Sequence, residues 1–155
     1  MVESSLHRFA PQAEFEVAGV AIPADPAVIT PAIRRAILEG RFEAEEASQL
    51  PHIVRPGDRV LEIGAGIGFI STLLAREPRV SRVIAVEANP HLLGYMARLH
   101  ARNRVRKVRR LNAVLTNEPV ASATFYIRRD FWMGSLAPGP NPYLSTVEVL
   151  SLIHI

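Results

Sequence analysis

Residues 59–68 read R-V-L-E-I-G-A-G-I-G, a run of strand-forming residues that ends in three alternating glycines. The following residues, Phe69–Arg76, have the apolar spacing of a helix. A chain that turns sharply between a strand and a helix favours residues without a Cβ, and bare backbone also lets a ligand approach closely. This unit predicts an α/β fold with a ligand at the carboxyl end of the strand.

Strands and helices alternate on both sides of this unit. Alternation of this kind implies a parallel sheet, so we expect an α/β protein with a Rossmann-like three-layer α/β/α sandwich. Its predicted elements are a strand at 15–22, helices at 30–40 and 42–50, strands at 59–63 and 82–87, a helix that opens at Asn89-Pro90, and strands at 108–111 and 123–127.

The glycine pattern differs from the dinucleotide-binding fingerprint. G-x-G-x-x-G requires a small residue at the position that Phe69 occupies. The pattern here is E-x-G-x-G-x-G, with Glu62 two residues before the first glycine. The segment therefore points to a nucleoside ligand other than a dinucleotide.

Two further strand ends complete the predicted pocket. Glu87 ends the second strand and should face the glycine loop, where its carboxylate can accept hydrogen bonds from both ribose hydroxyls. Asn112 and Ala113 follow the third strand, where an amide side chain and a free backbone N–H are suited to reading the edge of an adenine. Together the three strand ends predict one continuous nucleoside pocket.

The segments E-I-G-A-G-I-G, A-V-E-A-N-P and L-N-A resemble the class I S-adenosylmethionine-dependent methyltransferases. More narrowly, G-R-F-E-x-E-E at 40–46 and R-P-G-D-R-V-L-E-I-G-A-G-I-G-F-I-S at 55–71 resemble the FkbM family. The resemblance implies S-adenosyl-L-methionine as the cofactor. It assigns to the methionine portion and the turn Glu62, Gly64, Ala65, Gly66 and Gly68. It assigns the ribose to Glu87, and it places beside the adenine Ala88, Asn112 and Ala113.

By the same resemblance, we expect methyl transfer to an oxygen of a small molecule or sugar. No residue is assigned as the general base. We take Glu43 as a solvated carboxylate at a helix start rather than a cofactor contact. Residues 130–135 follow a strand near the expected mouth of the pocket and are candidates to contact the acceptor, whereas Trp132 is as well explained by packing.

Two alternatives stay open. The basic residues between Arg98 and Arg110 would suit an RNA or other nucleic-acid methyltransferase. We interpret them as a solvated surface at the opposite end of the sheet, poor in aromatic residues, and therefore do not expect a nucleic-acid partner. The other alternative is a nucleotide-binding Rossmann domain without methyltransferase activity.

Composition excludes several other classes. The 155 residues suit one domain, and the absence of cysteine excludes disulfides, cysteine-based zinc sites and thiol catalysis. We predict no metal site. Neither a signal peptide nor a membrane-spanning run is evident, so we expect a cytoplasmic protein without a membrane partner.

The carboxyl-terminal part departs from the family pattern. We expect a cap segment at 1–52 and an incomplete methyltransferase domain at 53–149, because the D-x-E-G strand of the family is absent. Residues 150–155 (L-S-L-I-H-I) match the translation of a sequencing adaptor, and we expect them, His154 included, to have no role in the fold or in catalysis. We therefore expect strand 59–63 to have an unpaired edge and the chain by itself to be inactive.

Overall fold

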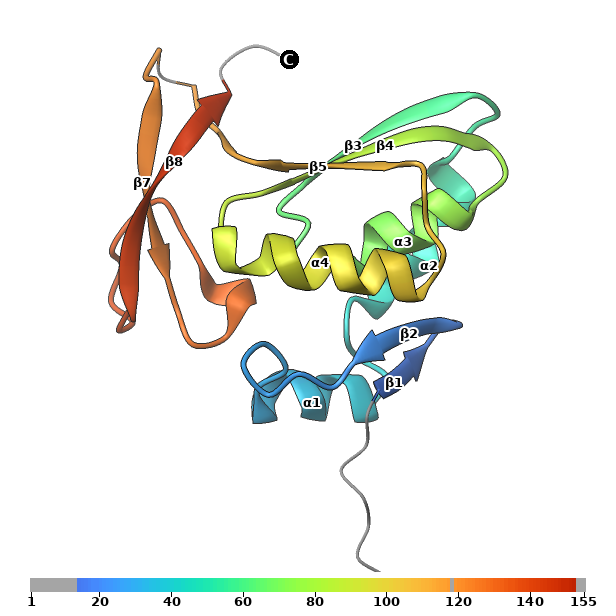
Figure 1. Ribbon diagram of the computed structural model, residues 1–155, viewed down its shortest axis with the longest axis horizontal. Coiled ribbons are helices and arrows are strands. Elements are labelled where there is room, and N and C mark those ends of the chain that lie inside the picture. Colours follow the sequence, from blue (N-terminus) through green and yellow to red (C-terminus); the bar gives the residue numbers. More distant parts are fainter. Residues whose placement is uncertain (1–13, 118, 153–155) are drawn as a thin grey trace, which may run out of the picture.

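The computed structural model describes residues 14–117 and 119–152 (Figure 1). The first part of the expected cap segment, residues 1–13, and His154 lie outside the described residues. In chain order the elements are β1 (Glu14–Val17), β2 (Val20–Pro23), α1 (Pro31–Leu38), α2 (Ala44–Ile53), β3 (Asp58–Ile63), α3 (Phe69–Arg76), β4 (Val80–Glu87), α4 (Pro90–Arg102), β5 (Val108–Asn112), β6 (Val114–Leu115), β7 (Ser122–Ile127), the 3-10 turn η1 (Phe131–Met133) and β8 (Ser145–Leu152).

The described part of the cap segment forms a hairpin, helix α1 and nearly all of helix α2, where the sequence predicted a helix at 42–50. The single strand predicted at 15–22 is in fact two, because Ala18 and Gly19 take φ angles of 47° and 74° and reverse the chain. Helix α1 begins as predicted, with the Thr30 hydroxyl accepting a hydrogen bond from the Ile33 N–H. The hairpin and α1 pack against α3 and α4 through one apolar cluster, so the cap lies on the helix layer and not on the sheet (Figure 1).

Strands β3, β4 and β5 form the predicted parallel sheet, in that order. Its helix-facing side carries Val60, Val83 and Ala85, which pack against residues of α2, α3 and α4. Because all three strands run the same way, the glycine loop after β3, Glu87 at the end of β4 and the end of β5 meet at one edge. No helix in the described part of the chain is long and apolar enough to cross a membrane.

The opposite face of this sheet is open. Helices α2, α3 and α4 all lie on one side in Figure 1, and no described helix covers the other. Leu61 and Ile63 consequently keep 37% and 59% of their surface exposed. Among the described residues β3 pairs only with β4, which confirms the unpaired edge that we predicted. The third layer of the expected sandwich is thus not formed by residues 14–117 and 119–152.

A second sheet has the order β6-β8-β7. The strand predicted at 123–127 is present as β7 but does not extend the parallel sheet: it pairs antiparallel with β8, and the connection between the two strands, residues 128–144, contains no α-helix for a parallel crossover. Residues 150–152, which we expected to take no part in the fold, form the end of β8, where Ser151 and Leu152 pair with β6.

Candidate functional site

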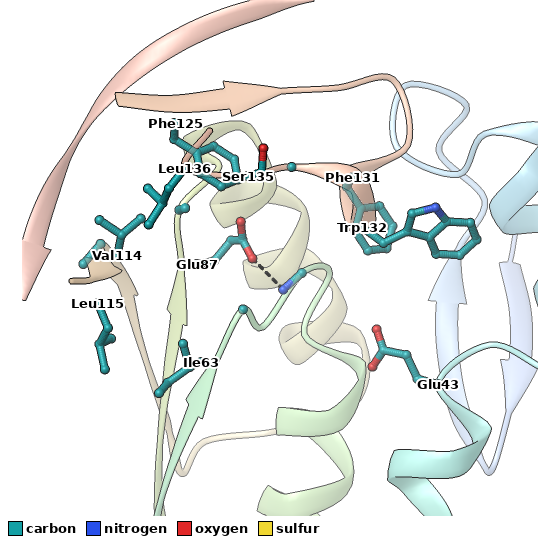
Figure 2. Close-up of a pocket in the computed structure, with 15 residues that line it drawn as sticks. Glu43, Ile63, Glu87, Val114, Leu115, Phe125, Phe131, Trp132, Ser135 and Leu136 are labelled. Carbon is teal, nitrogen blue, oxygen red and sulfur yellow. Dashed lines mark hydrogen bonds between the residues drawn. The ribbon is translucent and has the colours of Figure 1, made fainter. Parts of the chain in front are cut away.

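A cavity of about 390 Å³ opens at the carboxyl edge of the parallel sheet (Figure 2). Its walls come from the glycine loop, the end of β4, β6 and the segment that contains η1, with one residue from the cap. The lining residues are Glu43, Ile63, Gly64, Gly66, Glu87, Ala88, Ala113, Val114, Leu115, Phe125, Phe131, Trp132, Gly134, Ser135 and Leu136. This is the edge at which the strand ends predicted a ligand.

Glu87 faces the glycine loop, as predicted, and is only 6% exposed. One of its oxygens, Oε2, accepts a hydrogen bond of 2.7 Å from the Gly66 N–H, and Oε1 accepts one of 2.7 Å from the Asn89 N–H. Burial raises the pKa of Glu87, while these N–H donors lower it. A carboxylate can accept about four hydrogen bonds, so acceptor capacity remains for a ligand in the cavity.

The three glycines of the loop have different roles. All take positive φ angles, and a Cβ on Gly64 would meet nothing within 4 Å. A Cβ on Gly66 would lie 3.0 Å from a ring carbon of Phe131, and one on Gly68 would lie 2.5 Å from the Met96 side chain. Gly64 and Gly66 line the cavity, whereas Gly68 is required by packing against α4 and does not border the cavity.

The predicted adenine-reading donors are used within the protein. The Asn112 side-chain amide donates to the carbonyl oxygens of Glu87 (2.8 Å) and Ala88 (2.9 Å). The Ala113 N–H, expected to be free, donates to the Glu87 carbonyl oxygen at 3.2 Å. These bonds tie the end of β5 to the end of β4. Ala88 and Ala113 still line the cavity, but Asn112 positions the strand ends and does not border the cavity.

Two other predicted residues lie behind the loop. Ala65 is buried in a cluster with Ala85 and Met96. Glu62 points toward the helix layer, and its Oε2 is buried without a hydrogen-bond partner in the described part of the chain. Burial, the largest cause, raises the pKa of Glu62 to about 8, and the nearby carboxylate of Glu43 adds to the increase. Neither residue borders the cavity.

Glu43 belongs to the site, contrary to our expectation of a solvated carboxylate. Figure 2 shows its carboxylate directed toward the glycine loop. Burial, followed by repulsion from Glu46, raises the pKa of Glu43 to about 7. The preceding residue, Phe42, is buried with its ring centroid 5.5 Å from that of Phe69 in α3, so packing of the cap delivers Glu43 to the cavity.

The segment after β7 closes the cavity. Phe131, Trp132 and Ser135 line it, which places the segment at the mouth as we expected. Trp132 packs beside Phe42, with ring centroids 6.5 Å apart, but its indole remains 47% exposed. The apolar wall of Val114, Leu115, Phe125 and Leu136 was not predicted; the only sequence signal for it is the alternation of Phe125 and Ile127 on one face of β7.

The chemistry of the cavity fits S-adenosylmethionine. Its charged lining residues are Glu43 and Glu87, and no lysine or arginine of the described part of the chain lines it. Such a site favours a ligand with a positive charge, hydroxyls for the Glu87 carboxylate and a flat apolar ring, which correspond to the sulfonium and ammonium groups, the ribose and the adenine of the cofactor. Burial raises the pKa of Glu43, and a cation bound beside it would favour the ionised form of its carboxylate.

Comparison with known proteins gives a family and a fold. The family model described as the TRM5/TYW2 methyltransferase domain matches residues 35–120, more than half of the chain. TYW2 of M. jannaschii in complex with AdoMet is similar in structure, with a TM-score of 0.51 and 22% identity over 74% of this chain and 49% of that one. Trm5b from Pyrococcus abyssi has a TM-score of 0.50 and 21% identity over 69% of this chain and 33% of that one.

This chain therefore spans from about a third to a half of the length of the solved structures that it resembles. At these identities they show a shared class I methyltransferase fold. No curated protein matches the chain.

These findings confirm part of the sequence-based reading and correct the rest. A methyltransferase domain with S-adenosylmethionine as its cofactor is confirmed, whereas the FkbM family is not supported. The expectation of a small-molecule or sugar acceptor without a nucleic-acid partner is wrong, because methyltransferases of the TRM5/TYW2 type act on tRNA. With the strand order, the glycine loop and the matched residues in agreement, the chain belongs to the TRM5/TYW2 methyltransferase domain family.

Proposed function

We propose that the protein transfers a methyl group from S-adenosylmethionine to a nucleoside of tRNA. The observation that carries the proposal is the half-exposed indole of Trp132 at the mouth of the cofactor cavity, in a domain of this family. Enzymes that act on RNA bases stack unpaired bases on aromatic side chains.

The cavity residues divide the cofactor among them. S-adenosylmethionine supplies the methyl group at its sulfonium. Glu87 would accept hydrogen bonds from the ribose hydroxyls, and the small Ala88 and Ala113 would leave room for the adenine against Phe125. Glu43 would offset the positive charge of the methionine end. The chain's contribution is to hold the donor and exclude water at one sheet edge.

The basic run at 98–110 is not one RNA-binding patch. Arg98 pairs with Asp25, and Arg102 pairs with Glu14. The Lys107 ammonium donates to the carbonyl of Val80, the first residue of β4, and so lies at the end of the sheet opposite the cavity. We therefore place the acceptor at the Trp132 mouth and not on this run.

The experiment is a substitution at the mouth with a matched control. In Trp132→Ala, tRNA binding, measured by fluorescence anisotropy of a labelled transcript, should weaken by about 5- to 150-fold, since stacking on an aromatic side chain contributes about 1–3 kcal/mol per base. Trp132→Phe should keep most of the affinity. Tyr143→Leu removes an aromatic residue of similar exposure that packs on Tyr126, outside the cavity lining, and should change little.

Methyl transfer from labelled S-adenosylmethionine to tRNA provides the second readout. S-adenosylhomocysteine affinity should stay constant in Tyr143→Leu and should change less than tRNA affinity in the two Trp132 variants, because Trp132 lines the cavity. A Trp132→Ala variant with unchanged tRNA binding, or a protein that methylates a sugar but not tRNA, would contradict the proposal.

A further inference from the structure

A second cavity, of about 430 Å³, lies on the far side of Phe131 from the cofactor cavity. Phe131 lines both, so the two cavities share a wall. The second cavity is bounded by the connection between β2 and α1, the first half of α4 and the end of β7. Its polar lining residues are Asp25, Asn89, His91, Tyr95, Arg98, Arg128 and Arg129.

Arg128 is a buried cation without a counter-anion. It is only 6% exposed, and its terminal nitrogens donate to uncharged oxygens of the following loop, those of Met133 and Ser135 and the carbonyls of Ala137 and Pro138. Its Nε–H is buried and has no partner among the described residues, and none of their carboxylates pairs with it. A buried charge without a counter-charge is costly, so this environment favours a bound anion.

The other charged residues of the second cavity do not neutralise the positive charge of Arg128. Asp25 is its one acidic lining residue, and its carboxylate lies 2.7 Å from a guanidinium nitrogen of Arg98. The side chain of Arg129 is exposed and makes no hydrogen bond or ion pair within residues 14–117 and 119–152. With Asp25 offset by Arg98, the charges of Arg128 and Arg129 remain for a ligand.

We propose that this second cavity binds a phosphodiester of the acceptor RNA, with Arg129 contacting the phosphate and Arg128 supplying buried positive charge. The inference rests on the proposed function and adds the position of the strand. A nucleotide whose base lies at Trp132 continues past Phe131, and its neighbouring phosphate then meets the arginines. Arginine is suited to this task because its planar guanidinium matches phosphate oxygens.

The test uses the full chain, a labelled tRNA transcript and three variants. Arg129→Gln should weaken binding by about three- to tenfold and lower the slope of log Kd against log salt by about 1, as expected for one lost phosphate contact. Arg129→Lys should keep most of the slope. Arg106→Gln replaces another exposed arginine, in the connection from α4 to β5, and as the matched control should leave the affinity unchanged. S-adenosylhomocysteine affinity should stay constant in all three, which shows that the fold is intact.

The outcomes separate this inference from the function on which it rests. If the protein binds tRNA and Arg129→Gln binds it equally well, or no more weakly than Arg106→Gln, the phosphate site is refuted and the proposed function stands. If the protein binds no tRNA, both are refuted. If inorganic phosphate raises the melting temperature of the original chain but not of Arg129→Gln, while tRNA affinity is the same in both, the cavity takes a free anion and the phosphodiester proposal is overturned.

Discussion

Glu87 should be needed for stability as well as for cofactor binding. Its two oxygens accept hydrogen bonds from the Gly66 and Asn89 N–H groups, both of which are buried. Each buried donor left without an acceptor costs about 1–3 kcal/mol, so Glu87→Ala would cost about 2–6 kcal/mol in total. Burial of the charged carboxylate is itself unfavourable, as the raised pKa of Glu87 indicates, and Glu87→Ala removes this cost. We therefore expect a net loss of about 2–4 kcal/mol in the free energy of unfolding.

Urea unfolding and calorimetry with S-adenosylhomocysteine measure the two roles separately. Glu87→Gln keeps one acceptor oxygen and should lose about half as much stability, yet it should still bind the ligand at least tenfold more weakly, since charge-assisted hydrogen bonds contribute about 1.5–3 kcal/mol each. Glu45→Ala, at an exposed position of α2, is the control. An unchanged urea midpoint in Glu87→Ala would refute the structural role, and unchanged affinity in Glu87→Gln would remove Glu87 from the cofactor site.

Three further predictions concern the glycine loop, a buried carboxylate and the open sheet face. Gly66→Val should abolish S-adenosylhomocysteine binding in calorimetry, because φ is +54° and even a Cβ would lie 3.0 Å from Phe131; retained binding would mean that the loop can shift. Because the pKa of Glu62 is about 8 in the folded protein and 4.5 in the reference state, the folded protein binds more protons between these values, and stability should fall as pH rises through this window. Urea unfolding from pH 5 to 9 should show a smaller fall in Glu62→Gln, in which the fall due to Glu43, whose pKa is about 7, remains; an equal fall in both proteins would contradict the assignment. Leu61→Lys should reduce self-association in light scattering without changing ligand affinity, because it places a charge on the exposed face of edge strand β3; equal scattering would show that this face is not the contact.

The local elements and the core of the site were predictable from the sequence. Helix α3 has the predicted bounds, and α1 has the predicted Thr30 cap, because glycine, proline and hydroxyl residues act within a few positions of the chain. Glu87 was predictable because the ends of neighbouring parallel strands meet at one sheet edge whatever the surrounding structure. The unpaired edge of β3 was predicted on a different ground, the absence of the D-x-E-G strand that the family resemblance implied.

Other features depend on contacts between distant segments. Glu43 reaches the cavity because Phe42 packs on Phe69, a contact that no local pattern encodes. From the sequence, the Asn112 amide was expected to bind a ligand. In the fold, the carbonyls of Glu87 and Ala88 lie within its reach and accept its hydrogen bonds. A polar group that enters the interior must find a partner there, and only the tertiary structure decides which one.

Which basic residues are paired, buried or exposed likewise depends on the tertiary structure. In the sequence, Arg98 and the basic residues that follow it form one run, while Arg128 stands apart. In the fold, Arg98 and Arg128 line one cavity, and Lys107 lies at the far end of the sheet. Sequence alone determined how many charges the chain carries, whereas the folding of residues 133–138 around the Arg128 guanidinium decided which of them is buried without a counter-charge.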